Sequence, residues 1–196
     1  MPLRTNLRPG QTPLDPDEIL GLKDLTITTK EALDSAEQLN VAAARAWYAG
    51  GQPVHPATLL GEFFLHELHR QMFANVWEWA GDLRKTEKNI GCRYYMIAQE
   101  LRRLCDDAQY WLANSTYSPD ELALRFKHRL VAIHVYPNGN GRHARFVADL
   151  LAEALGREPF SWGEMYDPEP ARRAYIDALR RADKEDYAML ISYARS

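Results

Sequence analysis

Residues 134–145 read HVYPNGNGRHAR, and this stretch decides which fold and chemistry the chain supports. Two glycines around an asparagine allow positive φ angles that turn backbone N–H groups toward one point, and the next residues begin a helix whose N-terminus attracts anions. Arg142 and Arg145 lie about one helical turn apart and can bind further phosphate oxygens. His134 has an ordinary pKa that suits a general base near neutral pH. The stretch therefore predicts a polyphosphate site with a base at its edge.

Length and composition favour one globular domain without a broad affinity for polyanions. The chain has 196 residues, 24 of them basic and 27 acidic, which gives a net charge of −3. We therefore expect no nucleic-acid partner and no membrane partner, and no apolar run approaches the roughly 20 residues that cross a bilayer. Residues 1–11 do not resemble a signal peptide. The only cysteines, Cys92 and Cys105, form no disulfide framework, so we expect a cytoplasmic protein.

The N-terminal part divides into an irregular arm and a helical domain. Residues 1–25 contain four prolines and predict the arm, which leaves residues 26–196 as the domain. Thr28 and Glu31 have the spacing of a capping box, so we expect a helix over about residues 29–48.

The rest of the chain predicts helices with one interruption. A second helix follows Pro56, and the polar segment Lys85–Ile97 predicts a hairpin, or flap, with a strand over its last four residues. Ser118 is the clearest N-cap, because proline and two acids follow it. Further helices are expected near 98–113, up to the motif, over 142–155, and near 168–182 and 184–194. The predicted class is all-α with one small β element.

Two other interpretations of the motifs fail on spacing. Residues 139–144 fit the dinucleotide fingerprint G-x-G-x-x-A, but the helix that starts at Ser118 leaves no room for a preceding strand. His66 and His69 suggest a zinc-binding helix, but the zincin pattern needs histidines four residues apart, not three. We expect these histidines to be ordinary residues of a helix face.

The stretch 134–145 resembles the signature of the Fic family, H-x-F-x-[D/E]-G-N-G-R-x-x-R. Most members of this family transfer AMP from ATP to a hydroxyl side chain of a target protein. The matching positions are His134, Gly139, Asn140, Gly141, Arg142 and Arg145, with Tyr136 in place of phenylalanine. The resemblance extends over roughly residues 55–194, and Thr12-Pro13-Leu14-Asp15 adds a likeness to the subgroup called mobile mystery protein B. It implies a Fic-type helical bundle with a small β-hairpin flap.

The resemblance also implies a role for each matching residue. His134 would be the general base, Gly139-Asn140-Gly141 would hold the α- and β-phosphates of ATP, Arg142 the β-phosphate and Arg145 the γ-phosphate. The flap, with Lys88, Asn89 and Ile90, would dock the target protein by strand addition. The chain is then expected to be a protein adenylyltransferase that uses ATP.

Asn138 departs from the family signature. An acid that binds Mg²⁺ stands at this position in the family, and a carboxamide can ligate Mg²⁺ only without adding charge. We therefore expect Asn138 to be a weak Mg²⁺ ligand. The departure leaves room for a nucleotide-binding module with little transfer activity that acts through a partner, or for an enzyme that removes AMP.

The sequence also departs from many Fic proteins in a motif for regulation. Many Fic proteins carry an inhibitory helix, [S/T]-x-x-x-E-[G/N], whose glutamate pairs with the second motif arginine. No glutamate here meets that pattern. Glu37, on the helix expected over 29–48, is the nearest candidate, although we expect it to be a surface charge. The resemblance also leaves room for a regulatory, antitoxin-like partner.

Overall fold

The computed structural model describes residues 12–163 and 168–196, and within these ranges the chain is built of helices. The all-α prediction is therefore confirmed. In chain order the helices are α1 (Pro16–Ile19), α2 (Lys30–Ala49), α3 (Pro56–Leu59), α4 (Glu62–Phe73), the 3₁₀ helix η1 (Tyr94–Met96), α5 (Ile97–Ala113), α6 (Pro119–Ile133), α7 (Asn140–Ala154), α8 (Pro168–Ala182) and α9 (Ala188–Ala194). None of these helices is long and apolar enough to span a membrane.

Local signals explain where the helices begin. The Ser118 side chain accepts a hydrogen bond from the Glu121 N–H (3.4 Å) and caps α6, as predicted. Thr29, not Thr28, caps α2 through the Ala32 N–H (3.2 Å), so the predicted cap was wrong by one residue. Gly61 divides the helix expected after Pro56 into α3 and α4.

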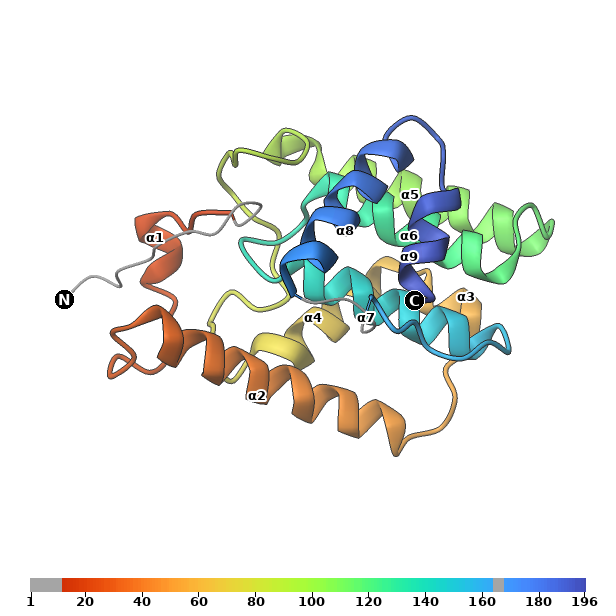
Figure 1. Ribbon diagram of the computed structural model, residues 1–196. Coiled ribbons are helices and arrows are strands. Elements are labelled where there is room, and N and C mark those ends of the chain that lie inside the picture. The colour runs from red at the N-terminus through yellow and green to blue at the C-terminus, as the bar shows by residue number, and fades with distance from the viewer. Residues whose placement is uncertain (1–11, 164–167) are drawn as a thin grey trace.

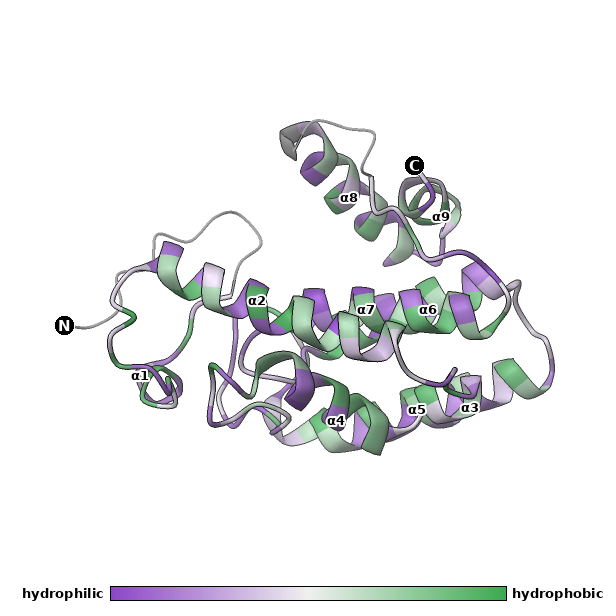
Figure 2. Cartoon of the chain, turned by 90° about the horizontal axis from the view of Figure 1, so that it is seen from below, coloured by the Kyte–Doolittle hydropathy of each residue, from purple (hydrophilic) through white to green (hydrophobic). Residues whose placement is uncertain are grey.

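The helices form layers around α6 and α7 (Figure 1). Figure 2 shows α6 and α7 in the middle, with α3, α4 and α5 on one side and α8 and α9 on the other. Their facing side chains form one continuous apolar core. Its largest fully buried hydrophobic members are Trp77, Tyr136, Phe73, Phe126, Leu59, Leu60, Leu65, Leu68, Met72 and Ile97. Burial of such side chains is the main stabilisation of the fold.

The predicted flap is a loop rather than a hairpin. Residues 82–93 contain no strand, and the expected strand over residues 94–97 is η1 followed by the start of α5. Part of the predicted N-terminal arm lies outside the described residues; the rest contains α1 and forms an isolated antiparallel bridge between Leu22 and Trp77. The loop has no strand pairing of its own, and it is held by the backbone hydrogen bonds from the Arg84 N–H to the Val135 carbonyl (3.0 Å) and from the Cys92 N–H to the Ile133 carbonyl (3.3 Å), together with side-chain contacts.

Candidate functional site

His134 ends α6 in a left-handed conformation, with φ 57° and ψ 65°. Non-glycine residues seldom adopt this conformation, so the surrounding contacts must hold it. The side chain is buried, and neither ring nitrogen has a hydrogen-bond partner among the described residues. Burial, with smaller effects of the Arg84 and Lys88 charges, lowers the pKa of His134 to about 4. This neutral imidazole can accept a proton from a group that enters the site.

Arg84, which the sequence analysis did not identify, fixes the backbone of His134. Its guanidinium donates to the carbonyl oxygens of His134 (2.6 Å), Thr86 (2.7 Å) and Cys92. Arg84 is 2% exposed, so these bonds are shielded from water. Gly91 in the same loop has φ +102°, and a Cβ there would lie 2.6 Å from the His134 Cβ. The loop therefore packs directly on the histidine, and only glycine fits at this contact.

The loop between α6 and α7 is held in a preformed shape. Gly139 is the N-cap of α7 with φ 79°, and a Cβ there would lie 2.5 Å from the Phe73 ring. The Asn140 side chain accepts from the Tyr136 N–H (2.9 Å) and donates to the Tyr136 carbonyl (2.7 Å). The first N–H groups of α7 have no carbonyl partner within their helix, which makes this end a site for an anion. Because the Asn140 amide already braces the loop, a phosphate contact by that side chain stays a prediction.

His69 supports the same loop from α4. Its Nδ1 accepts from the Gly81 N–H (3.0 Å), so its Nε2 carries the hydrogen that is donated to the Asn138 carbonyl (3.0 Å). The ring stacks on Tyr136, with centroids 3.7 Å apart. His69 is fully buried, and burial keeps its pKa well below the ordinary value. The expectation of an ordinary helix-face residue is therefore wrong for His69, although the described residues contain no group of three or more His, Cys, Asp or Glu suited to a metal.

Glu37 of α2 contacts Arg142, the first arginine of the motif. Its Oε2 pairs with the Arg142 Nη2 (2.6 Å), while its Oε1 accepts from the Trp77 indole (2.6 Å). Glu37 is only 2% exposed, so the expectation of a surface charge is wrong. A buried carboxylate thus occupies the guanidinium that was expected to bind a phosphate.

Arg145, the second arginine, has different surroundings. Its guanidinium lies over the rings of Tyr175 (4.5 Å to the centroid) and Trp162 (5.3 Å). Among the described residues no carboxylate pairs with Arg145, and its side chain is half-buried. Arg145 is therefore held by aromatic faces and by a hydrogen bond to the Tyr175 hydroxyl, and it has no carboxylate partner among the described residues.

Asn138 faces both the loop and α2. Its Oδ1 accepts from the Gly139 N–H (2.7 Å), and its Nδ2 lies 3.5 Å from the Glu37 Oε1. Mg²⁺ prefers several oxygen ligands, usually with at least one carboxylate and phosphate oxygens. The single amide oxygen of Asn138 is already hydrogen-bonded, so the protein residues alone do not fit a Mg²⁺ site.

The loop residues expected to dock a target differ in exposure. Asn89 and Ile90 are exposed, whereas the Lys88 side chain is 1% exposed. The Lys88 ammonium pairs with Asp15 (2.7 Å) and Glu18 (2.5 Å) at the start of the described chain. Lys88 therefore reaches a target only if this N-terminal segment moves.

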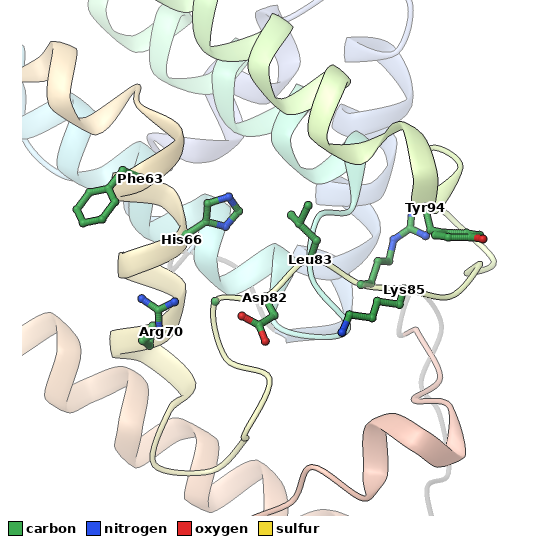
Figure 3. A pocket seen from close by; sticks show the side chains of 9 residues that line it. Phe63, His66, Arg70, Asp82, Leu83, Lys85 and Tyr94 are labelled. Atoms are coloured by element: carbon green, nitrogen blue, oxygen red, sulfur yellow. The ribbon is translucent and has the colours of Figure 1, made fainter.

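A cleft lies next to the candidate site, and none of the residues that line it belongs to the stretch 134–145 (Figure 3). It has a volume of about 680 Å³, and α4, the loop 81–85 and Tyr94 line it. Two lining residues nevertheless reach the stretch 134–145: Arg84 bonds the His134 carbonyl and His66 contacts Tyr136. The chemistry predicted for the motif therefore belongs to the junction of α6 and α7 rather than to this cleft.

Comparison with known proteins supports this arrangement. The Fic/DOC family model matches residues 60–152. A curated protein called protein adenylyltransferase fic-1, from Caenorhabditis briggsae, is 29% identical over 132 residues, which cover 65% of this chain and 25% of that protein. This chain thus matches about a quarter of the length of that relative.

Solved structures show the same fold. The N-terminal FIC domain of Bep8 from Bartonella sp. 1-1C has a TM-score of 0.70 at 17% identity and covers 90% of both chains. A Fic domain of a cell filamentation protein from Bartonella quintana, solved with bound ADP, has a TM-score of 0.68 at 18% identity and covers 87% of this chain and 86% of that one. Fic-1 from C. elegans has a TM-score of 0.64 at 22% identity, over 83% of this chain and 47% of that one. The segment that carries the candidate site, residues 60–152, thus matches the Fic/DOC family model, and the chain has the fold of these Fic domains.

Proposed function

We propose that this chain is a protein adenylyltransferase that transfers AMP from ATP to a Ser, Thr or Tyr hydroxyl of a target protein. The observation that carries the proposal is the buried, neutral imidazole of His134, with two unused nitrogens, beside the N-terminus of α7. The adenylyltransferase name of the C. briggsae relative and the ADP bound to the B. quintana domain support the same chemistry.

The reaction follows from the roles that these groups can take. A ring nitrogen of His134 takes the proton of the target hydroxyl as its oxygen attacks the α-phosphorus. The bond from that phosphorus to the oxygen shared with the β-phosphate breaks, and pyrophosphate leaves. The α7 N–H groups, Arg142 and Arg145 stabilise the phosphate charge, so alignment and electrostatics supply most of the catalysis. We propose that the target docks beside the exposed residues Asn89 and Ile90, in the cytoplasm.

The test is the transfer reaction itself. Purified protein is incubated with ATP labelled at the α-phosphate, Mg²⁺ or Mn²⁺, and cell lysate, and labelled proteins are counted after electrophoresis. Wild-type protein should label a target, and His134→Ala should lower labelling at least about a thousandfold. His55→Asn, a change at an exposed histidine that keeps a capping side chain, is the matched control. Equal labelling by His134→Ala and wild type would refute the proposal.

A second candidate function is nucleotide binding with little transfer. The Glu37–Arg142 pair and the missing acid at Asn138 favour it, because both weaken the hold on a metal–triphosphate. Such a module would bind ATP in calorimetry, yield no labelled protein and act through a regulatory partner. Removal of AMP is the third alternative, and it would appear as AMP release from a modified target.

A further inference from the structure

A buried lysine lies beside the phosphate-facing end of α7. Lys127 of α6 is fully buried, and its ammonium donates to the Tyr175 hydroxyl. The ammonium also lies 4.5 Å from the Tyr175 ring centroid and 5.9 Å from that of Trp162. In the described part of the chain no carboxylate forms an ion pair with Lys127. A buried ammonium with three donors and one neutral acceptor is costly, so its presence calls for an explanation.

Lys127 and Arg145 share one aromatic ring. The Arg145 guanidinium lies 4.5 Å from the centroid of the same Tyr175 ring. Tyr175 and Arg145 are half-buried and reach the surface, whereas Lys127 is fully buried. Burial alone would raise the pKa of the Tyr175 hydroxyl, but the Lys127 and Arg145 charges lower it. Two cations therefore meet at this ring, and among the described residues no acid forms an ion pair with either of them.

The position of Lys127 on its helix connects the cluster with the base. Lys127 lies on α6 seven residues before His134, the left-handed C-cap with which that helix ends. Helix α7 packs on α6 and presents Arg142 and then Arg145, one turn farther from His134. A polyphosphate that starts near His134 and follows α7 would end beside Arg145 and the Tyr175 ring.

We propose that Lys127 is a positioning residue of the nucleotide site. It holds Tyr175, the ring on which Arg145 rests, and thereby favours nucleotide substrates that carry a terminal phosphate. The inference rests on the proposed function, because it requires a nucleotide along α7. Lys127 acts through Tyr175 and through its charge, and it does not touch the ligand. Lys127 therefore affects which nucleotide binds, while His134 carries out the proton transfer.

The test compares the affinities for ATP and AMP, measured by calorimetry in the presence of Mg²⁺. Lys127→Met removes the charge and keeps an apolar chain of similar length. We expect it to weaken ATP binding about tenfold and to leave AMP binding within about twofold, because only ATP reaches Arg145. The melting temperature should stay the same or rise, because a buried charge that has no carboxylate partner in the described part of the chain is lost. A purely structural lysine would instead lower the melting temperature and leave the ATP-to-AMP affinity ratio unchanged.

A double-mutant cycle checks that the effect passes through the tyrosine. In a Tyr175→Phe background, Lys127→Met should change the ATP-to-AMP ratio by less than about twofold, since the hydroxyl that Lys127 holds is gone. Lys184→Met, at an exposed lysine after α8, controls for the loss of one positive charge.

The outcomes separate this inference from the proposed function. Unchanged ATP affinity in Lys127→Met, or an equal fall for ATP and AMP, would overturn the role of Lys127 and leave the transferase proposal standing. If wild-type protein bound neither nucleotide, the proposed function and the inference would both be overturned.

Discussion

The amide of Asn138 suits its position next to a buried acid. It accepts from the Gly139 N–H through Oδ1 and directs Nδ2 at the Glu37 carboxylate, 3.5 Å away. An aspartate at this position would place a second negative charge beside Glu37, and the one guanidinium of Arg142 would have to balance both carboxylates. The missing acid and the Glu37 contact are therefore linked, and one should be changed together with the other.

This link predicts the result of restoring the acid. Asn138→Asp alone should raise the Mg²⁺-dependent affinity for ATP by less than about threefold, because Glu37 opposes the new charge. The double change Asn138→Asp with Glu37→Gln should raise it at least about tenfold above the value for Glu37→Gln alone, since a carboxylate binds Mg²⁺ better than an amide. Calorimetry with and without Mg²⁺ measures both values. A full gain from the single substitution would show that Glu37 does not restrain the site.

The pKa of His134 predicts the pH dependence of transfer. The imidazole must be neutral to act as a base, and burial lowers its pKa to about 4. The kcat/KM for transfer should therefore stay level from pH 7.5 to about pH 5, instead of falling near the ordinary histidine pKa of about 6.5. Initial rates are measured at each pH, with folding confirmed by circular dichroism. An acid limb centred near pH 6.5 would contradict a buried neutral base.

At the scale of elements, helix α2 restrains the nucleotide site through one side chain. Glu37→Gln keeps the acceptor for the Trp77 indole and removes the charge that holds Arg142. We expect it to tighten ATP binding about tenfold, because the freed guanidinium can pair with a phosphate. Glu31→Gln, at an exposed position of the same helix, should leave the affinity unchanged. Equal affinities of Glu37→Gln and wild type would mean that ATP never uses Arg142.

Helix α1 restrains the loop over the site in a comparable way. Lys88 of that loop is held by Asp15 and Glu18, and Thr86 bonds the same Asp15 carboxylate (2.5 Å). The double change Asp15→Asn with Glu18→Gln should speed amide hydrogen exchange in residues 85–93 at least about tenfold, because the loop lacks a ladder of its own. Mass spectrometry measures the exchange. Asp17→Asn, an exposed acid on α1, is the control, and unchanged exchange in the double variant would show that other contacts hold the loop.

For the whole molecule, the sequence predicted those features that depend on residues close together in the chain. The cap at Ser118, the turn at Gly139 and the helical class follow from residues close together in the chain. Arg84 was missed and the burial of Glu37 was not foreseen, because their partners lie 50 and 105 residues away and no local pattern marks such pairs. The strand expected over residues 94–97 is absent because this segment has no partner strand: Tyr94 and Tyr95 stay exposed on η1, and Ile97 is buried as the first residue of α5.

The buried histidines predict how the stability of the folded protein depends on pH. His69, His134 and His143 are buried, and burial lowers the pKa of each, to about 4 for His134 and about 3 for His143. The unfolded chain binds these protons below pH 6.5 and the folded chain does not. The stability is therefore complete above that pH and is lost as the pH falls toward the folded-state values. Three such groups approach a loss of about 4 kcal/mol per pH unit.

Urea unfolding at pH 7.5, 6.5 and 5.5 tests this dependence. The free energy of unfolding should change little between the first two values and fall steeply between the last two. His143→Gln keeps a donor for the Leu65 carbonyl, which the His143 Nε2 contacts at 3.0 Å, and should reduce the slope by about 1.4 kcal/mol per pH unit because one titrating group is removed. His55→Asn, at an exposed site, should leave the slope unchanged. A stability that is the same at pH 6.5 and 5.5 would mean that the folded protein takes up these protons as readily as the unfolded chain does.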